Sequence, residues 1–317
     1  MIETDETLSV NSQGSMVKYK LIISYRKGAK LLEANKMSNL NRIFTRNMLR
    51  HFIDGKKDNV YSSVVRRYLN DVERKNNGEL ISEIYCELRN NYRNEYFYKN
   101  TLLNKLLLGV HSVNTTTALT ELAIAKSKAD FVLINGKAVV YEIKTELDNL
   151  DRLSSQIDDY YKAFDHVAVV TYEKNLIQLQ RVLDYINKPV GIYVLRKNGK
   201  LGTIRKPQRY TGELDQEVYF KLLRKHEYED IILQKYGYLP EVTQFKYYST
   251  CKNMFLQIPQ KESYLLTLKV LKKRMKLERE EFVKIPYELK FLAYFMELSY
   301  EDYQKLEIFL EDQYGGA

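Results

Sequence analysis

Three charged residues fall within two predicted strands in the middle of the chain. Asp130 opens the first strand, and Glu142 and Lys144 lie two positions apart in the second. Because side chains alternate across a strand, this spacing places Glu142 and Lys144 on one face. A charged pair inside an apolar strand costs several kcal/mol unless a partner compensates it, and a divalent metal held by the carboxylates would do so. The pattern therefore indicates a metal site.

The Glu-x-Lys spacing alone is weak evidence, since it occurs three times, at 73–75, 142–144 and 288–290. The first and third occurrences lie in polar, helical patterns, and we interpret both as solvated helix faces. Only the middle one lies in a strand that looks buried, with Asp130 opening its hairpin partner. We therefore assign the chemistry to this pair.

The hairpin register decides whether these carboxylates can meet. Asn135 and Gly136 form a strong turn signal between the two strands. A two-residue loop would turn Asp130 to the face opposite Glu142. A three-residue loop over 134–136, with Gly136 in the left-handed conformation, would place Asp130 on the face of Glu142, one diagonal step away. We expect this loop, or a bulge that restores the same facing.

The residues that flank the hairpin could add to the site. Glu121 lies on or near the preceding strand, and Gln156 and Tyr160 lie four apart on a predicted helix at 150–164, so the latter two share one face. They could orient a metal-bound water or contact a phosphate, although a solvent-facing Gln beside a half-buried Tyr is the simpler interpretation of this pair alone. The apolar stripe of the helix consists of Leu150, Leu153, Ile157, Tyr161 and Phe164.

The stretch 95–171 resembles the PD-(D/E)XK nuclease superfamily, which has the restriction-endonuclease-like fold, and more closely an uncharacterised bacterial branch of it. The similarity covers the central third to half of the chain. The matching motifs are Thr120-Glu121, Ala129-Asp130, Tyr-Glu-Ile-Lys-Thr-Glu-x-Asp at 141–148, and Arg-Leu-x-x-Gln-x-x-x-Tyr at 152–160. Ala129 stands where the motif that names the family has Pro, a difference that does not touch the chemistry.

The resemblance implies a role for each residue. Asp130 and Glu142 would be metal ligands, with the Ile143 carbonyl as a further ligand and Glu121 as an accessory one. Lys144 would position or activate the attacking water and stabilise the charge that develops on phosphorus. Hard oxygen ligands favour Mg²⁺, and Mn²⁺ is expected to substitute.

Three functions remain open, in decreasing order of support. The first is a metal-dependent phosphodiester hydrolase, a nuclease, with DNA endonuclease favoured and with Gln156 and Tyr160 in the catalytic set. The second is a nucleic-acid-binding module of the same fold that does not cut. The third is a structural protein with a buried ion cluster, which is usually less stable than apolar packing. A role in defence or in mobile elements fits by association only.

Composition agrees with a nucleic-acid partner. The 317 residues carry 50 basic and 41 acidic side chains, for a net charge of +9, and a basic surface attracts polyanions. We expect DNA rather than RNA as the partner, and a homodimer stays open. Cys86 and Cys251 are too few and too far apart for a disulfide scaffold or a Cys-based zinc site. With neither a membrane-span pattern nor a secretory signal, we expect no membrane partner and a cytoplasmic location.

The elements that must position these residues predict an α/β fold, with a mixed central sheet flanked by helices. We expect a disordered tail at 1–16, a helical N-terminal region at 17–97, the α/β core at 98–210 and a helical C-terminal region at 211–317. Strands are predicted at 115–124, 129–134, 138–145, 167–171, 191–195 and 201–205. Helices are predicted at 98–110, 150–164, 176–186, 217–236, 263–281, 286–298 and 300–314. Residues 64–67 and 269–279 are candidate phosphate-contact faces, or simply solvated helix faces.

Overall fold

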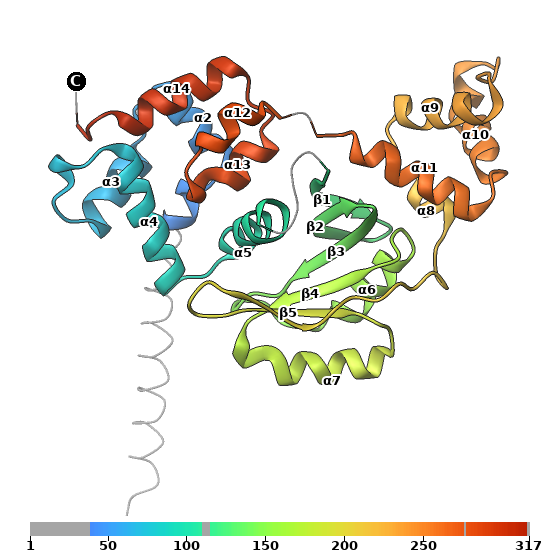
Figure 1. Cartoon of the computed structure of the whole chain (residues 1–317), viewed down its shortest axis with the longest axis horizontal. Coiled ribbons are helices and arrows are strands. Elements are labelled where there is room, and N and C mark those ends of the chain that lie inside the picture. The colour runs from blue at the N-terminus through green and yellow to red at the C-terminus, as the bar shows by residue number, and fades with distance from the viewer. Residues whose placement is uncertain (1–38, 110–114, 276, 316–317) are drawn as a thin grey trace, which may run out of the picture.

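The structure, a computed structural model, describes residues 39–109, 115–275 and 277–315. Within them lies one mixed sheet of six strands in sequence order (Figure 1). The strands are β1 Thr117–Ile124, β2 Ser127–Asn135, β3 Lys137–Ile143, β4 Val167–Thr171, β5 Gly191–Leu195 and β6 Leu201–Arg205. Strands β1 to β3 form an antiparallel meander, β3 to β5 run parallel, and β6 is antiparallel to β5. The predicted mixed sheet is confirmed.

The β2–β3 hairpin is tighter than the expected three-residue loop. Asn135 pairs with Lys137, so Gly136 alone forms the bend, with a φ of +68°. The register then runs without a shift to Phe131 opposite Tyr141. Continued by one step, it places Asp130 directly across from Glu142, and not one diagonal step away. The predicted loop was too long. Asp130 and Glu142 still lie on the same face of the sheet, because the predicted and the observed registers differ by an even number of residues.

Gly136 offers a direct test of this hairpin. An added Cβ would meet no atom within 4 Å, so a Gly136→Ala change costs only the strain of a left-handed backbone, about 1–2 kcal/mol. We expect the free energy of unfolding in urea to fall by that amount. Gly202→Ala is the matched control, since Gly202 lies in β6 at a φ that is not positive and its Cβ would make ordinary contacts. Equal stability of the two variants would contradict the assigned bend.

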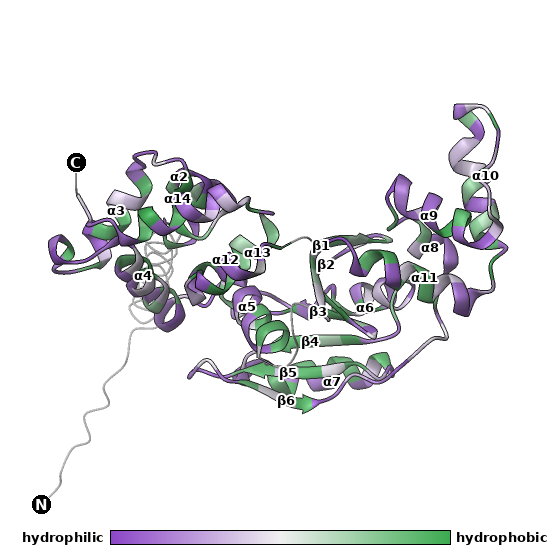
Figure 2. Cartoon of the chain, turned by 45° about the horizontal axis from the view of Figure 1, so that its top comes forward, coloured by the Kyte–Doolittle hydropathy of each residue, from purple (hydrophilic) through white to green (hydrophobic). Residues whose placement is uncertain are grey.

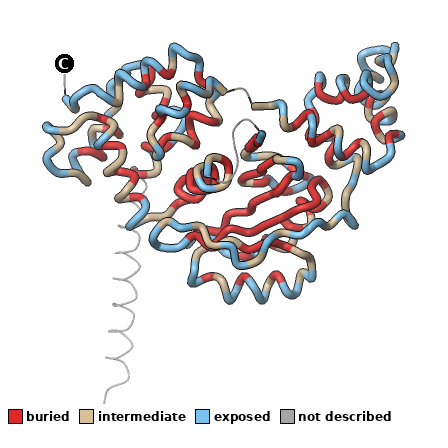
Figure 3. Tube along the Cα trace, viewed as in Figure 1, coloured by how far each residue is buried: buried red, intermediate tan, exposed pale blue. Residues whose placement is uncertain are grey.

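Helices cover both faces of the sheet. One face packs against α5 (Glu95–Leu102) and the π-helical turn Leu103–Leu108 that continues it. The other face packs against α6 (Leu153–Tyr161) and α7 (Leu176–Ile186). Because side chains alternate, Tyr141 contacts the first layer and Val140 the second. Figure 3 shows the buried strands between these layers, and Figure 2 shows how hydrophobic residues follow β4 and β5.

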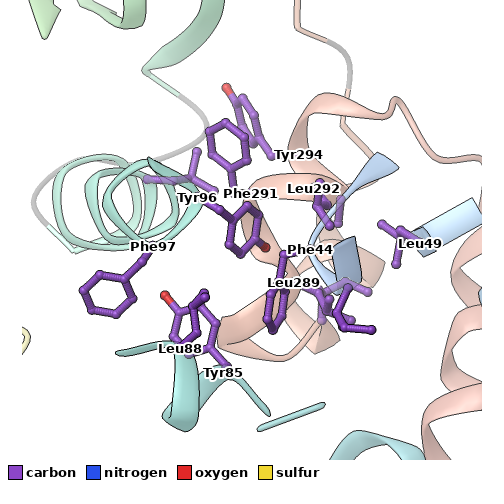
Figure 4. Close-up of a cluster of buried hydrophobic side chains, with 14 of the residues drawn as sticks. Phe44, Leu49, Tyr85, Leu88, Tyr96, Phe97, Leu289, Phe291, Leu292 and Tyr294 are labelled. Atoms are coloured by element: carbon purple, nitrogen blue, oxygen red, sulfur yellow. The ribbon is translucent and has the colours of Figure 1, made fainter. Parts of the chain in front are cut away.

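The first and last helices of the described chain pack together into one helical lobe. The lobe consists of α2 Arg46–Ile53, α3 Asn59–Tyr68, α4 Asn77–Asn91, α12 Arg279–Lys284, α13 Lys290–Phe295 and α14 Tyr300–Glu311. Phe52 stacks on Phe309 with ring centroids 4.5 Å apart, and Arg50 pairs with Asp302 at 2.7 Å. Figure 4 shows part of this cluster, where Phe44 contacts Tyr85 and Tyr96, and Tyr96 contacts Phe291. The last helix begins with a capping box formed by Ser299 and Asp302.

The remaining C-terminal helices pack mainly on one another beside the sheet, and the last of them contacts β2. They are α8 Gln216–Phe220, α9 Lys225–Tyr236, α10 Gln244–Leu256 and α11 Gln260–Lys272. The single region expected at 211–317 thus divides between two packing clusters. The helix predicted at 217–236 breaks between α8 and α9, α10 was not predicted, and α11 ends nine residues before the expected 281.

Short 3₁₀ turns complete the described chain, at Val72–Arg74, Glu173–Asn175 and Tyr287–Leu289. The expected tail at 1–16 and the start of the region at 17–97 lie outside the described residues. Across the described ranges, no helix combines the length and apolarity needed to cross a membrane.

Candidate functional site

Glu142 lies near the end of β3 with only 2 % of its surface exposed. Its carboxylate accepts hydrogen bonds from Gln156 Nε2 at 2.6 Å and from the Tyr160 hydroxyl at 2.5 Å. Lys144 Nζ lies 2.9 Å from the same carboxylate. The buried charge is therefore compensated by three donors, as burial of a carboxylate requires.

Lys144 is held in place at both its backbone and its side chain. Its N–H donates to the carbonyl of Val170, and its own carbonyl accepts from the hydroxyl of Thr171, so β4 fixes its main chain. Its ammonium donates to Gln156 Oε1 at 2.9 Å while it contacts Glu142. The residue is 8 % exposed. A lysine fixed this firmly presents its charge at one defined point at the end of the strand.

Helix α6 supplies the predicted Gln156 and Tyr160 pair. Gln156 accepts from Lys144 and donates to Glu142, which fixes the orientation of its amide. Burial, together with the negative charge of Glu142, raises the pKa of the Tyr160 hydroxyl far above its usual range. The hydroxyl therefore stays protonated and donates a hydrogen bond. Both side chains therefore contact Glu142, and the simpler interpretation, a solvent-facing Gln beside a half-buried Tyr, was wrong. The predicted apolar stripe is confirmed at Leu153, Ile157 and Phe164, which are fully buried.

Asp130, in β2, binds the backbone of β3 through its side chain. Its Oδ2 accepts the Ile143 N–H at 2.8 Å, and its carbonyl accepts from the Thr120 hydroxyl. Burial and the nearby charge of Glu142 together raise the pKa of Asp130 to about 8. The hairpin register places Asp130 opposite Glu142, on the face that carries Val132 and Val140, so the two predicted carboxylates lie on the same side of the sheet, as expected.

Glu121 adjoins Asp130 but has its own partners. It lies on β1 between the paired residues Thr120 and Leu122, with a left-handed φ of +56°. Its carboxylate contacts the ammonium groups of Lys99 and Lys128. Such a backbone conformation is unusual for a non-glycine residue, and here it aims the carboxylate towards α5.

A third carboxylate, Glu95 in the first turn of α5, completes an acidic cluster that the sequence did not predict. Glu95, Glu121 and Asp130 each offer one oxygen, and these oxygens all lie within 4.8 Å of one another. Glu95 also pairs with Lys99 at 2.5 Å. Its signal in the sequence was weak, because Glu95 lies 25 residues before Thr120, where the first recognised strand motif begins.

The predicted site therefore consists of two adjoining halves. Glu142, Lys144, Gln156 and Tyr160 form one hydrogen-bonded network. The acidic cluster forms the other, and Asp130 joins the two halves because it belongs to the cluster and lies across the hairpin from Glu142. The donor set of the cluster, carboxylate oxygen alone, fits Mg²⁺ or Mn²⁺ and not Zn²⁺, which prefers nitrogen and sulfur.

The two other Glu-x-Lys sequences lie away from this site. Lys75 pairs with Glu83, consistent with an exposed role. Lys290 instead donates to the carbonyls of Phe282 and Val283, and burial lowers its pKa. Interpreting the third sequence as a solvated face was therefore wrong for its lysine, which ties α12 to α13.

The candidate phosphate-contact faces differ in what they expose. Arg66 and Arg67 on α3 are exposed and line a cavity of about 360 Å³ with Asn59, Ser62 and Ser63. In the stretch 269–279, Arg274 is no surface cation, because its guanidinium binds the buried Glu227. Lys269 and Lys273 remain at the surface of that stretch.

The comparisons with known proteins point to one family. The profile of the family described as Bacteriophage P4 protein cII matches residues 88–292. Protein cII of Enterobacteria phage P4 is 26 % identical over 147 residues, which cover 45 % of this chain and 50 % of that protein, so the chain spans about half the length of this curated relative. A solved protein of unknown function from Silicibacter pomeroyi aligns with 41 % of this chain and 87 % of its own, at 10 % identity and a TM-score of 0.26, too low to bear on the fold. Because the profile match extends over more than half of its length, the chain belongs to the family of bacteriophage P4 protein cII.

Proposed function

We propose that this chain is a metal-dependent phosphodiester hydrolase, a nuclease of PD-(D/E)XK type with DNA as its favoured target. The observation that carries the proposal is the buried Lys144 ammonium, fixed between the Glu142 carboxylate and the Gln156 side-chain oxygen. A buried network of two carboxylates and one lysine is costly. Such an arrangement is common where a site does chemistry.

The carboxylates supply the metal half of the proposed site. Asp130, Glu121 and Glu95 would hold Mg²⁺ or Mn²⁺, with Glu142 and the Ile143 carbonyl as the further ligands that the resemblance implies. A bound cation would lower the pKa of a water and neutralise charge on the phosphate. Lys99 and Lys128 contact the same carboxylates in this structure and would have to move aside.

The other half supplies positioning and charge. The Lys144 ammonium would stabilise negative charge as it develops on the phosphoryl oxygens. Gln156 and Glu142 hold that ammonium in place, so no reorganisation is needed during the reaction. The Tyr160 hydroxyl donates a hydrogen bond to the Glu142 carboxylate and keeps its orientation.

A nucleic-acid-binding module that does not cut is the second candidate. It is favoured by the number of donors around Glu142, since three protein groups already bind this carboxylate. The phage origin of the curated relative supports a role in mobile-element biology for either candidate. A cytoplasmic location is part of the same proposal.

A plasmid-nicking assay tests the proposal. We expect the wild-type chain to convert supercoiled DNA to nicked or linear forms with Mg²⁺ or Mn²⁺ and not with EDTA. Asp130→Ala should abolish this activity. Cleavage that persists in EDTA would overturn the metal-dependent mechanism, whereas binding without cleavage in every metal would favour the second candidate.

Metal binding can be measured without any cleavage. Calorimetric titration of Mn²⁺ is expected to show about a tenfold or greater loss of affinity for Asp130→Ala, since even groups that only orient ligands are worth roughly 10- to 100-fold. Lys144→Ala should retain the affinity. The matched control is Asp151→Ala, which removes an exposed carboxylate from the segment that follows β3. Unchanged binding by Asp130→Ala would remove this residue from the metal site.

A further inference from the structure

A groove with a volume of about 740 Å³ lies beside the proposed site. It is bounded by the β1–β2 turn, one side of α6 and the end of α8. Four cationic side chains from these three elements line it: Lys126, Arg152, Lys162 and Lys221. Because these cationic side chains come from separate segments and line one groove, they can contact several charges of an extended anion.

The acids of the groove are already neutralised. Asp158 pairs with Lys188 at 2.6 Å. Asp159 pairs with Lys162 at 2.8 Å and accepts from the Ser127 hydroxyl and the Lys126 N–H.

Three cations remain available in the groove. Lys126, Arg152 and Lys221 are exposed, and none of the three is in an ion pair with another described residue. The lining therefore carries a surplus of positive charge.

Helix α6 and strand β2 carry residues of both the groove and the proposed site, at neighbouring positions in the sequence. On α6, Asp159 faces the groove, while the next residue, Tyr160, contacts Glu142. On β2, Ser127 binds Asp159, while the carbonyl of Lys128 lies 3.0 Å from the Tyr160 hydroxyl. A polyanion lying along the groove would thus lie against the same helix and strand that hold Tyr160 in the proposed site.

We infer that this groove binds the phosphate backbone of the nucleic acid strand that enters the site, so that Lys126, Arg152 and Lys221 are substrate-binding residues. The inference rests on the proposed function for the direction of the strand, but the charge and the shape of the groove are independent of catalysis. Backbone contacts of this kind fix position without reading sequence.

The test uses the full chain with Lys144→Ala, which removes the proposed catalytic charge and leaves the groove intact. In this background the triple change Lys126→Glu, Arg152→Glu and Lys221→Glu is compared with a control of equal charge change, Lys137→Glu, Arg181→Glu and Lys206→Glu. The control residues are exposed and do not line the groove. Fluorescence anisotropy with short DNA and RNA oligonucleotides, single-stranded and duplex, is recorded across a range of salt concentrations.

We expect the groove variant to bind at least about tenfold more weakly than the control. The slope of log affinity against log salt should fall by about one for each phosphate that the protein no longer neutralises. Equal binding by the two triple variants would overturn the inference, as would a chain that binds no nucleic acid at all. Loss of binding in the groove variant, with no cleavage by the wild type, would support the groove and refute the proposed nuclease. Cleavage by the wild type, with equal binding by both triple variants, would support the proposed nuclease and refute the groove.

Discussion

Replacing Lys144 with alanine is expected to lower the cleavage rate by about two to three orders of magnitude, the usual effect of removing one group that stabilises transition-state charge. Binding of metal and nucleic acid should change little, because the proposed ligand Asp130 remains. The fold should also persist, since Glu142 keeps its hydrogen bonds from Gln156 and Tyr160. Single-turnover cleavage and anisotropy measured on the same preparation separate the two effects.

The matched control is Lys137→Ala at the other end of the same strand. Lys137 is exposed and pairs across the hairpin through its backbone alone. It should cut at the wild-type rate. If Lys144→Ala cut as fast as this control, the chemistry would have to reside elsewhere in the chain.

The second large effect concerns stability. Arg274 binds Glu227 through two nitrogens at 2.6 Å and donates to the carbonyl of Leu222. Both side chains are at most 10 % exposed. Arg274→Met should therefore lower the free energy of unfolding by about 3–5 kcal/mol, because it leaves the Glu227 charge buried without its partner. Lys273→Met, at the exposed neighbouring position, should have little effect.

The pH dependence of this pair gives an independent check. Burial alone would raise the pKa of Glu227, but the hydrogen bonds from Arg274 and from the Arg224 N–H outweigh it and hold the pKa below its usual value near 4.5. A lowered pKa stabilises the folded state above the unfolded-state pKa, and this contribution is lost as the pH falls through the folded-state pKa. The stability difference between wild type and Arg274→Met in urea should thus shrink as the pH drops below about 4.5. A difference that stays constant down to lower pH would show that lost packing, not lost charge pairing, causes it.

The sheet could be predicted well because its strands carry strong local signals. Apolar, β-branched runs and the hairpin residues Asn198 and Gly199 were enough to give β4, β5 and β6 their observed bounds. The site facing was also predictable, since the alternation along β3 and the four-residue spacing on α6 leave few choices. The length of the β2–β3 turn was not, because three-residue and tighter bends with Gly136 left-handed satisfy the same facing.

The features that could not be predicted from the sequence depend mostly on contacts between distant segments. Glu95 joins the acidic cluster only because α5 packs across the sheet end near Glu121. No spacing in the sequence relates the two. Helix α10 escaped prediction because its exposed Phe245 and Tyr248 blur the apolar stripe that marks a surface helix. Arg274 looked like one more cation in a basic run until its packing against Glu227 was known.

The helical lobe has a consequence for how the chain is made. Arg50 and its partner Asp302 are 252 positions apart, so a ribosome delivers one side of the lobe long before the other. When a nascent chain has been translated as far as residue 272, all residues of the sheet and of α5 to α11 are present. Phe309, on which Phe52 stacks, has not yet been made. During that interval the apolar faces of α2 to α4 are open to other chains and to chaperones. The lobe can therefore close only after the last helix has been translated.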